Sequence, residues 1–184
     1  MNVKNKQKTR NIVSFDIDGV LNNYPHCWVK YLNKITGKDF NSKAEAKAAL
    51  SIDDYDTIKN EYRLSGEVSE FTRVNLEMVE LIREYHQRGY RIIISTSRPI
   101  LSAQYPDLFH LTSSWLHYIG LPDFELLYKS VGLPDHIDIM SQILFHVDDE
   151  TKFIEEFNNF NIKTFHYSFS NCDKIPFELK HHLD

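Results

Sequence analysis

Short runs of hydrophobic residues alternate along this chain with longer segments in which hydrophobic residues recur every three or four positions. The short runs predict buried strands at 11–15, 91–95, 125–128, 143–147 and 162–167. The periodic segments predict helices at 76–88, 112–119 and 152–160, with Thr112 as the N-cap of the second. Apolar strands that alternate with amphipathic helices indicate an α/β fold, with a Rossmann-like parallel sheet covered by helices on both faces.

One long segment, 22–72, departs from this alternation because its patterns are all helical. Three helices are expected there: one with Trp28, Leu32 and Ile35 on one face, one that begins at Ser42 with a capping box, and one closed by Gly66. An insertion after the first strand of a parallel sheet lies above the carboxyl ends of the strands, where ligands bind. We therefore expect residues 10–21 and 73–184 to form a core and 22–72 to form a small helical cap that shapes the pocket.

The composition excludes several classes of protein. With 184 residues, of which 42% are hydrophobic and 26% charged, the chain has the makeup of one globular domain with an insertion. Asp and Glu outnumber Lys and Arg by 26 to 21, which gives a formal net charge of −5. A surface of this sign disfavours binding along duplex nucleic acid, although a local basic pocket is compatible with it.

The chain shows no sign of membrane insertion or export. No apolar run approaches the roughly 20 residues that a membrane-spanning helix needs, and the basic start lacks the apolar stretch of a signal peptide. We therefore expect a cytoplasmic protein in which Cys27 and Cys172 are thiols. Neither cysteine belongs to a CxxC pair, so a metal bound by cysteine is not expected. The sequence indicates no particular oligomeric state.

Polar residues with reactive side chains follow four of the predicted strands. They are Asp16 and Asp18, Thr96 and Ser97, Lys129, and Asp148 and Asp149. Because the strands of a parallel sheet end at one edge, we expect these residues to converge there. Four carboxylates at close range repel one another, and Mg²⁺, a hard cation that takes oxygen ligands, would relieve the repulsion. Since Mg²⁺ favours phosphate as a further partner, a phosphorylated ligand is expected.

Three motifs lie at the ends of these strands: FDIDGV with Asp16, ISTSR with Thr96, and HVDDE with Asp148. In order and spacing they resemble the DxDGx signature, the second motif and the acidic fourth motif of the haloacid dehalogenase (HAD) superfamily of phosphohydrolases. The resemblance covers most of the chain outside 22–72 and implies a HAD-like core. The helical insertion, together with the segment TSSWL, resembles the 5′(3′)-deoxyribonucleotidase-like branch of that superfamily.

The resemblance implies a division of labour between the first two aspartates. Asp16 would be the nucleophile that attacks phosphorus and forms an aspartyl-phosphate. Asp18 would protonate the leaving oxygen and then deprotonate the hydrolytic water. These roles require Asp16 to be ionised and Asp18 to be able to hold a proton.

The same resemblance implies the ligands of the ion and of the phosphate. The Mg²⁺ ligands would be Asp16, the backbone carbonyl of Asp18, Asp148 and Asp149, and the phosphate-binding groups would be Thr96, Ser97 and Lys129. Related nucleotidases often have the lysine nearer the fourth motif, but no lysine lies between Asp135 and Val147. Lys129, at the end of a strand, is the first choice for this role, and Lys152 is the alternative.

The expected activity is that of a Mg²⁺-dependent phosphomonoesterase, with a nucleoside monophosphate as its small phosphorylated substrate. Two alternatives stay open. One is a phosphatase that acts on polynucleotide ends or sugar phosphates, and the other is a non-catalytic relative that binds phosphate.

Simpler interpretations compete for several of these residues. Asp18 with Gly19 fits an ordinary turn, Thr96 a helix cap, Asp148 and Asp149 the first turn of a helix, and Lys129 a solvated loop. Arg98 is expected to pair with a carboxylate or face solvent, and His146 to be a hydrogen-bonded core residue. The stripe of Trp28, Tyr31, Leu32 and Ile35 predicts packing. Tyr24, Trp28 and Tyr62 are candidate cap contacts with a substrate.

Overall fold

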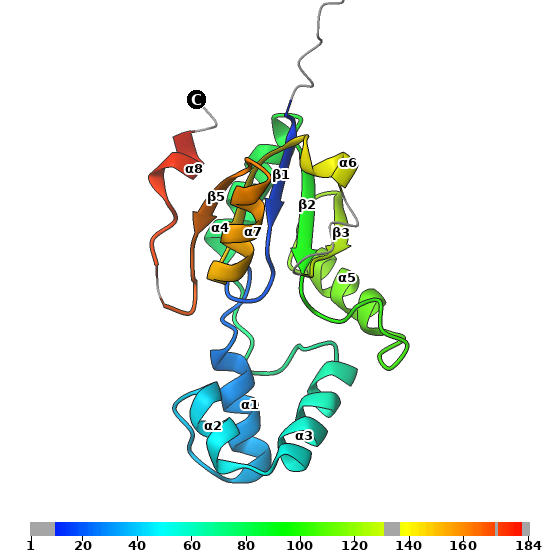
Figure 1. Ribbon diagram of the computed structural model, residues 1–184, viewed down its shortest axis with the longest axis vertical. Coiled ribbons are helices and arrows are strands. Elements are labelled where there is room, and N and C mark those ends of the chain that lie inside the picture. Colours follow the sequence, from blue (N-terminus) through cyan, green and yellow to red (C-terminus); the bar gives the residue numbers. More distant parts are fainter. Residues whose placement is uncertain (1–9, 131–136, 172, 182–184) are drawn as a thin grey trace, which may run out of the picture.

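The computed structural model describes residues 10–130, 137–171 and 173–181. Its centre is a sheet of five parallel strands in the order β3-β2-β1-β4-β5 (Figure 1). The strands are β1 (Ile12–Phe15), β2 (Arg91–Thr96), β3 (Phe124–Tyr128), β4 (Ile143–Asp148) and β5 (Lys163–His166). The predicted α/β fold with a parallel sheet is confirmed, and no strand bound differs from its expected position by more than one residue.

The chain between and after the strands forms helices, some of which cover the two faces of the sheet. They are α1 (His26–Thr36), α2 (Lys43–Ala49), α3 (Ile52–Leu64), α4 (Leu76–Gln87), α5 (Leu108–Tyr118), α6 (Ile137–Met140), α7 (Thr151–Asn159) and α8 (Phe177–His181). The sequence did not predict α6 and α8, because four or five residues are too few for a helical period to be visible.

The start of α5 differs from expectation, and the prediction that Thr112 caps it is wrong. The N-cap position is Asp107, and Thr112 lies fully buried within the helix. Leu108, one turn earlier, packs with Ile100 and Tyr105 in a small apolar cluster. Burial of Leu108 in this cluster stabilises one more helical turn before the threonine.

The register of the strands brings their carboxyl ends to one edge. Phe15, the last residue of β1, lies opposite Ile94 of β2 and Val147 of β4. Thr96, the last residue of β2, lies opposite Tyr128, the last residue of β3. The residues that follow β1, β2, β3 and β4 therefore start from the same edge of the sheet.

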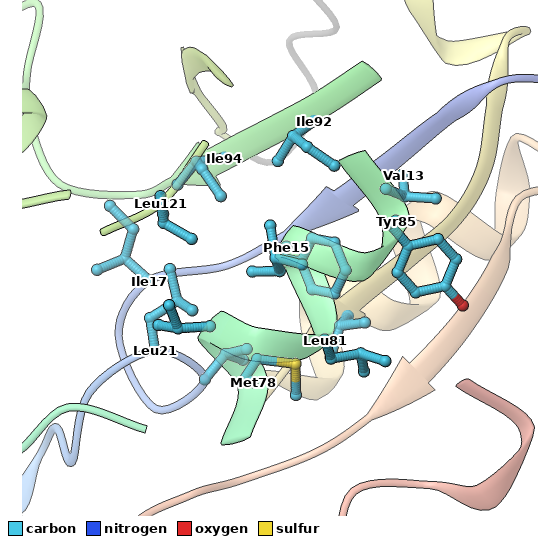
Figure 2. Close-up of a cluster of buried hydrophobic side chains, with 14 of the residues drawn as sticks. Val13, Phe15, Ile17, Leu21, Met78, Leu81, Tyr85, Ile92, Ile94 and Leu121 are labelled. Carbon is cyan, nitrogen blue, oxygen red and sulfur yellow. The ribbon is translucent and has the colours of Figure 1, made fainter. Parts of the chain in front are cut away.

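An apolar cluster packs against each face of the sheet. On one face, α4 contributes Met78, Leu81 and Tyr85, which pack on β1 around Phe15 (Figure 2). On the other face, Phe157 of α7 lies in a second cluster with residues of β1, β2 and β4. Full burial of each large side chain contributes about 1.5–3 kcal/mol. None of the helices in the described residues combines the length and apolar character that crossing a membrane requires.

Between β1 and α4, the chain leaves the sheet to form α1, α2 and α3, which lie beyond the carboxyl ends of the strands (Figure 1). These helices have their own apolar cluster, centred on Trp28, Tyr55 and Tyr62. The side chain of Ser42 accepts a hydrogen bond from the backbone of Glu45 at the start of α2, as the sequence predicted. Gly37, with a φ of 66°, ends α1. The helical segment thus stands opposite the edge at which the polar residues gather.

Candidate active site

The turn after β1 is shaped by a glycine. Asp16 follows β1 directly, and its backbone N–H donates to the carbonyl of Val147 at 2.9 Å. Gly19 has a φ of 85°, and a Cβ placed there would lie 2.1 Å from Oδ2 of Asp149. A side chain at position 19 is therefore excluded by both backbone conformation and the approach of Asp149. This glycine lets the turn after β1 pack against the residues after β4.

Three carboxylates meet at this edge of the sheet. Asp16, Asp148 and Asp149 each offer an oxygen atom, and these oxygens lie within 4.8 Å of one another. Asp148 is completely buried, Asp16 is 4% exposed, and Asp149 is half-buried. Carboxylates this close are costly unless a cation neutralises them. The geometry therefore provides a compact set of hard oxygen ligands.

Lys129 supplies one positive charge to this cluster. Its Nζ lies 2.7 Å from Oδ1 of Asp16 and also forms a buried ion pair with Asp148. Its backbone N–H donates to the carbonyl of Thr96 at 2.8 Å, which fixes the turn after β3. Lys152, the alternative lysine, has a side chain that is 56% exposed and pairs with Glu150. The structure thus brings Lys129, and not Lys152, against the aspartates.

The three carboxyl groups differ in pKa because their surroundings differ. Burial raises the pKa of Asp16 well above its ordinary value, Lys129 offsets part of this rise, and Asp148 adds to it. Burial acts in the same direction on Asp148, but the hydrogen bond from His146 and the charge of Lys129 lower its pKa to about 2. Burial and the charge of Asp148 raise the pKa of Asp149 to about 7. One lysine therefore does not neutralise the whole cluster.

Asp18 lies apart from this cluster and faces an arginine. Nη2 of Arg98 donates to Oδ1 of Asp18 at 2.7 Å, and Nε donates to Oδ2 at 3.0 Å. The amide of Asn22 donates to the same carboxylate at 2.9 Å. Burial raises the pKa of Asp18, but Arg98, Asn22 and Lys59 together lower it by more, and the net shift is downward. The order of the Asp16 and Asp18 pKa values is thus the reverse of what the expected roles require.

Arg98 also forms an ion pair with a residue of the segment that contains α3. Its Nε also lies 3.0 Å from Oε2 of Glu67, which in turn forms an ion pair with Lys59 of α3 at 3.2 Å. Glu67 is buried, and its φ of 57° lies in the left-handed region, which residues other than glycine rarely adopt. The expectation that Arg98 pairs with a carboxylate is confirmed, but no pattern in the sequence identified Asp18 and Glu67 as its partners.

Thr96 and Ser97 take different positions at the end of β2. Thr96 is 1% exposed, and its hydroxyl accepts a hydrogen bond from the backbone N–H of Arg98 at 3.1 Å. That bond does not use the hydroxyl hydrogen of Thr96, but Thr96 does not line the cavity described below. Ser97 is exposed and lines the pocket above the aspartates.

His146 is a hydrogen-bonded residue of the interior, as predicted. Its Nε2 lies 2.8 Å from Oδ2 of Asp148, and its Nδ1 lies 3.0 Å from the hydroxyl of Ser14, which lies 3.2 Å from that of Ser95. Burial lowers the pKa of His146, so its ring is neutral near pH 7. Since an ionised Asp148 can only accept, Nε2 carries the proton and donates it.

A cavity of about 370 Å³ opens above these residues. Its lining comprises Asp16, Asp18, Ser97, Arg98, Pro99, Asp149, Glu150 and Lys152 at the sheet edge, and Tyr24, Lys43, Lys47, Tyr55, Asp56, Lys59, Arg63 and Glu67 from the segment with α1–α3. Of the three aromatic residues expected to contact a substrate, Tyr24 lines the cavity, whereas Trp28 and Tyr62 are fully buried. The helical segment thus supplies half of the cavity wall.

The chemistry of the cluster fits a divalent cation. Three carboxylate oxygens within 4.8 Å of one another are the hard donors that Mg²⁺ prefers, and a cation also explains how Asp149 could be ionised at neutral pH. The Asp18 side chain does not belong to this set, because Arg98 and Asn22 bind it. The cluster that the structure presents for an ion is therefore Asp16, Asp148 and Asp149.

Comparisons with known proteins agree on the fold. No family model and no curated protein matches the sequence. The structure is similar to that of a Lactobacillus delbrueckii protein assigned as a phosphoglycolate phosphatase, with 14% identity over 94% of this chain and 92% of that chain and a TM-score of 0.60. It is also similar to the structure of a CbbY mutant from Rhodobacter sphaeroides in complex with xylulose-(1,5)bisphosphate. The identity is 13%, the match covers 90% of each chain, and the TM-score is 0.52. The chain has the α/β fold of these two proteins.

Proposed function

We propose that this protein is a Mg²⁺-dependent phosphomonoester hydrolase of the HAD type that uses Asp16 as its nucleophile. The observation that carries the proposal is the placement of Asp16 at the floor of a polar cavity, 2.7 Å from Lys129 and beside Asp148 and Asp149. Lys129 offsets part of the rise in the pKa of Asp16 that burial causes, and a divalent cation at the cluster would further favour the ionised form that a nucleophile needs. The fold shared with a protein assigned as a phosphatase supports the same reaction class.

In the proposed reaction, an Asp16 carboxylate oxygen attacks phosphorus, a new O–P bond forms, and the bond to the leaving oxygen breaks. The leaving oxygen takes a proton from Asp18. Water then attacks the phosphorus of the aspartyl-phosphate and gives a proton to Asp18, and the bond between Asp16 and phosphorus breaks. Inorganic phosphate and the alcohol are the products, so the enzyme returns to its initial state.

Asp18 needs a proton for the first step, and its contact with Arg98 opposes this. Arg98 lines the cavity, so the phosphate of a bound substrate is a competing anion for the same guanidinium. We infer that substrate binding weakens the attraction between Arg98 and Asp18 and raises the pKa of Asp18 toward the range that a general acid requires. Arg98 would then bind the phosphoryl oxygens, together with Thr96, the backbone after it, and Lys129.

Asp16, Asp148 and Asp149 would hold Mg²⁺, with the backbone carbonyl of Asp18 as a further expected ligand. The ion, when bound, would neutralise the charge of the phosphoryl group during transfer. Residues 22–72, with α1–α3, would be the cap that closes the cavity and selects the substrate, and 10–21 with 73–184 would be the catalytic core.

A nucleoside monophosphate is the proposed substrate class, with sugar phosphates and polynucleotide ends as alternatives. The cavity volume of about 370 Å³ suits a small molecule. The rings of Tyr24 and Tyr55 in its wall give an aromatic surface on which a base or a sugar can lie. A non-catalytic relative is disfavoured because Asp16, Asp18 and Asp148 are all present at the site.

The test is release of inorganic phosphate from p-nitrophenyl phosphate and from a panel of nucleotides and sugar phosphates, with Mg²⁺ or with EDTA. We expect turnover with Mg²⁺ and none with EDTA. Asp16→Asn should lower kcat by a factor on the order of 10³ or more, because the amide cannot form the aspartyl-phosphate. Turnover of Asp16→Asn close to that of the native chain would refute the assignment of the nucleophile.

A further inference from the structure

Positive charges outnumber carboxylates on the part of the cavity wall that the helical segment 22–72 forms. Its charged lining residues are Lys43, Lys47, Lys59 and Arg63 against Asp56 and Glu67, whereas the lining as a whole has six cations and six carboxylates. Ion pairs with Glu67 account for Lys59 and Arg63. Among the ion pairs of the described residues, none engages Lys43 or Lys47.

These two lysines belong to one face of one helix. Both lie on α2, four residues apart, so their side chains leave the helix in the same direction. Nζ of Lys43 lies 5.5 Å from the centre of the Tyr24 ring, and Nζ of Lys47 lies 5.4 Å from the centre of the Tyr55 ring. Both tyrosines line the cavity. The rings therefore hold the two ammonium groups at the cavity wall, opposite the aspartates across the same opening.

This arrangement costs stability when no anion is bound. Like charges four residues apart on a helix repel each other, and Lys43 lies in the first turn, where the helix dipole disfavours a cation. Burial, and then the charge of Lys47, lower the pKa of Lys43. The contacts with the Tyr24 and Tyr55 rings are the stabilising interactions described for these two lysines, and neither ring carries a formal negative charge. An anion between the two ammonium groups would remove the repulsion.

We propose that Lys43 and Lys47 bind a second phosphate group of the substrate, while the first phosphate lies at Asp16. This inference rests on the proposed function, hydrolysis of a phosphomonoester, and specifies a small phosphomonoester with a second phosphate group in place of the nucleoside monophosphate named above. The helical segment's part of the wall has four cations against two anions, an excess that matches the two negative charges of a phosphate better than the single charge of a carboxylate. Nucleoside 3′,5′-bisphosphates and sugar bisphosphates share this chemistry.

The experiment compares matched substrates that differ in the second phosphate. The pairs are adenosine 3′,5′-bisphosphate with adenosine 5′-monophosphate, and fructose 1,6-bisphosphate with fructose 6-phosphate. For each pair, kcat/KM is measured with Mg²⁺ for the native chain and for Lys43→Gln/Lys47→Gln. The matched control is Lys30→Gln/Lys34→Gln, which removes the same charge, also four residues apart, from exposed positions on α1 that do not line the cavity.

In at least one pair, we expect the native chain to prefer the bisphosphate by about tenfold or more, as two charge-assisted contacts allow. In Lys43→Gln/Lys47→Gln this ratio should fall close to one, chiefly through KM, and in the control it should stay as in the native chain. The pair that shows the preference identifies a nucleoside or a sugar as the carrier. No preference in either pair, or a preference that survives the double substitution, would overturn the proposal.

A binding measurement separates failure of this inference from failure of the proposed function. Thermal unfolding of Asp16→Asn is followed with each bisphosphate and each monophosphate. A larger rise in Tm with the bisphosphate, lost in Asp16→Asn/Lys43→Gln/Lys47→Gln, supports the lysine site even if the chain hydrolyses nothing. If the bisphosphate and the monophosphate raise the Tm of Asp16→Asn equally, and the native chain hydrolyses monophosphates, the lysine site is overturned and the proposed function stands.

Discussion

Nε2 of His146 lies 2.8 Å from Oδ2 of Asp148, and both side chains are completely buried. The histidine is held from its other side by Ser14, at 3.0 Å from Nδ1. This hydrogen bond fixes the carboxylate of Asp148 and helps to keep its pKa at about 2. His146 is therefore a positioning residue for the proposed ion site, because it acts on the ion through Asp148.

We expect His146→Leu to raise the Mg²⁺ concentration for half-maximal activity by about 10–100-fold, since the carboxylate loses its donor. His146→Gln retains an N–H donor and should restore part of the Mg²⁺ dependence. Phe157→Leu is the control, because it removes the ring stacked on His146 at 3.8 Å without changing the hydrogen bond to Asp148. An unchanged Mg²⁺ requirement in His146→Leu would show that the histidine serves packing alone.

Substitution of Lys129 and substitution of Lys152 should have different effects on kcat. Lys129→Gln should lower kcat by a factor on the order of 10² or more, because the buried cation beside Asp16 and Asp148 is lost. Lys152→Gln should have a much smaller effect on kcat, because its side chain is 56% exposed and its ion pair with Glu150 is screened by solvent. Steady-state kinetics on one monophosphate checks both. A larger loss in Lys152→Gln would mean that Lys152 is the functional lysine.

Gly19→Ala should impair both folding and metal binding. A positive φ costs an alanine roughly 1–2 kcal/mol, and the new Cβ would also displace Asp149, whose Oδ2 lies 2.1 Å from that position. Gly37→Ala is the control, because Gly37 has a φ of 66° but no atom within 4 Å of the added Cβ. Both variants should lose stability in urea unfolding, and only Gly19→Ala should also require more Mg²⁺. Equal Mg²⁺ requirements would contradict the predicted displacement of Asp149.

The raised pKa of Asp149 predicts a pH dependence of stability in EDTA. An unfolded aspartate ionises near pH 4, whereas Asp149 in the folded chain holds its proton up to about pH 7. The folded state therefore binds more protons between these values, and stability falls as pH rises through this window. Measured against Asp149→Asn, the free energy of unfolding of the native chain should decrease from pH 4 to pH 7 and then level off.

Saturating Mg²⁺ at pH 7 should reverse the difference in the free energy of unfolding between the native chain and Asp149→Asn. The ion stabilises the ionised carboxylate, so it should stabilise the native chain more than Asp149→Asn. A difference between the two chains that does not vary with pH in EDTA would mean that Asp149 is ionised in the folded state without a cation.

Local patterns along the sequence determined the elements of the fold. The apolar runs predicted β1, β2 and β4, because strands buried in the middle of a parallel sheet must be apolar. The edge strands β3 and β5 are less buried and were predicted from runs that also contain polar residues. The alternation of strands and helices then predicted a parallel sheet, and the parallel sheet placed the residues after β1, β2, β3 and β4 at one edge. The start of α5 was predicted wrongly because Leu108 is held by Ile100 and Tyr105, a contact that no local pattern contains.

Tertiary structure alone decided which charges face each other. The sequence placed Asp16 and Asp18 two residues apart, but only the fold turns one toward Lys129 and the other toward Arg98. Burial and the neighbouring carboxylates raise the pKa of Asp16 more than Lys129 lowers it, whereas the contacts of Asp18 lower its pKa, so the order is opposite to expectation. Likewise, the sequence shows that Lys43 and Lys47 are four residues apart, but only the tertiary structure shows that both line the cavity. Electrostatic energy depends on distance and burial in space, and neither quantity can be obtained from separation along the chain.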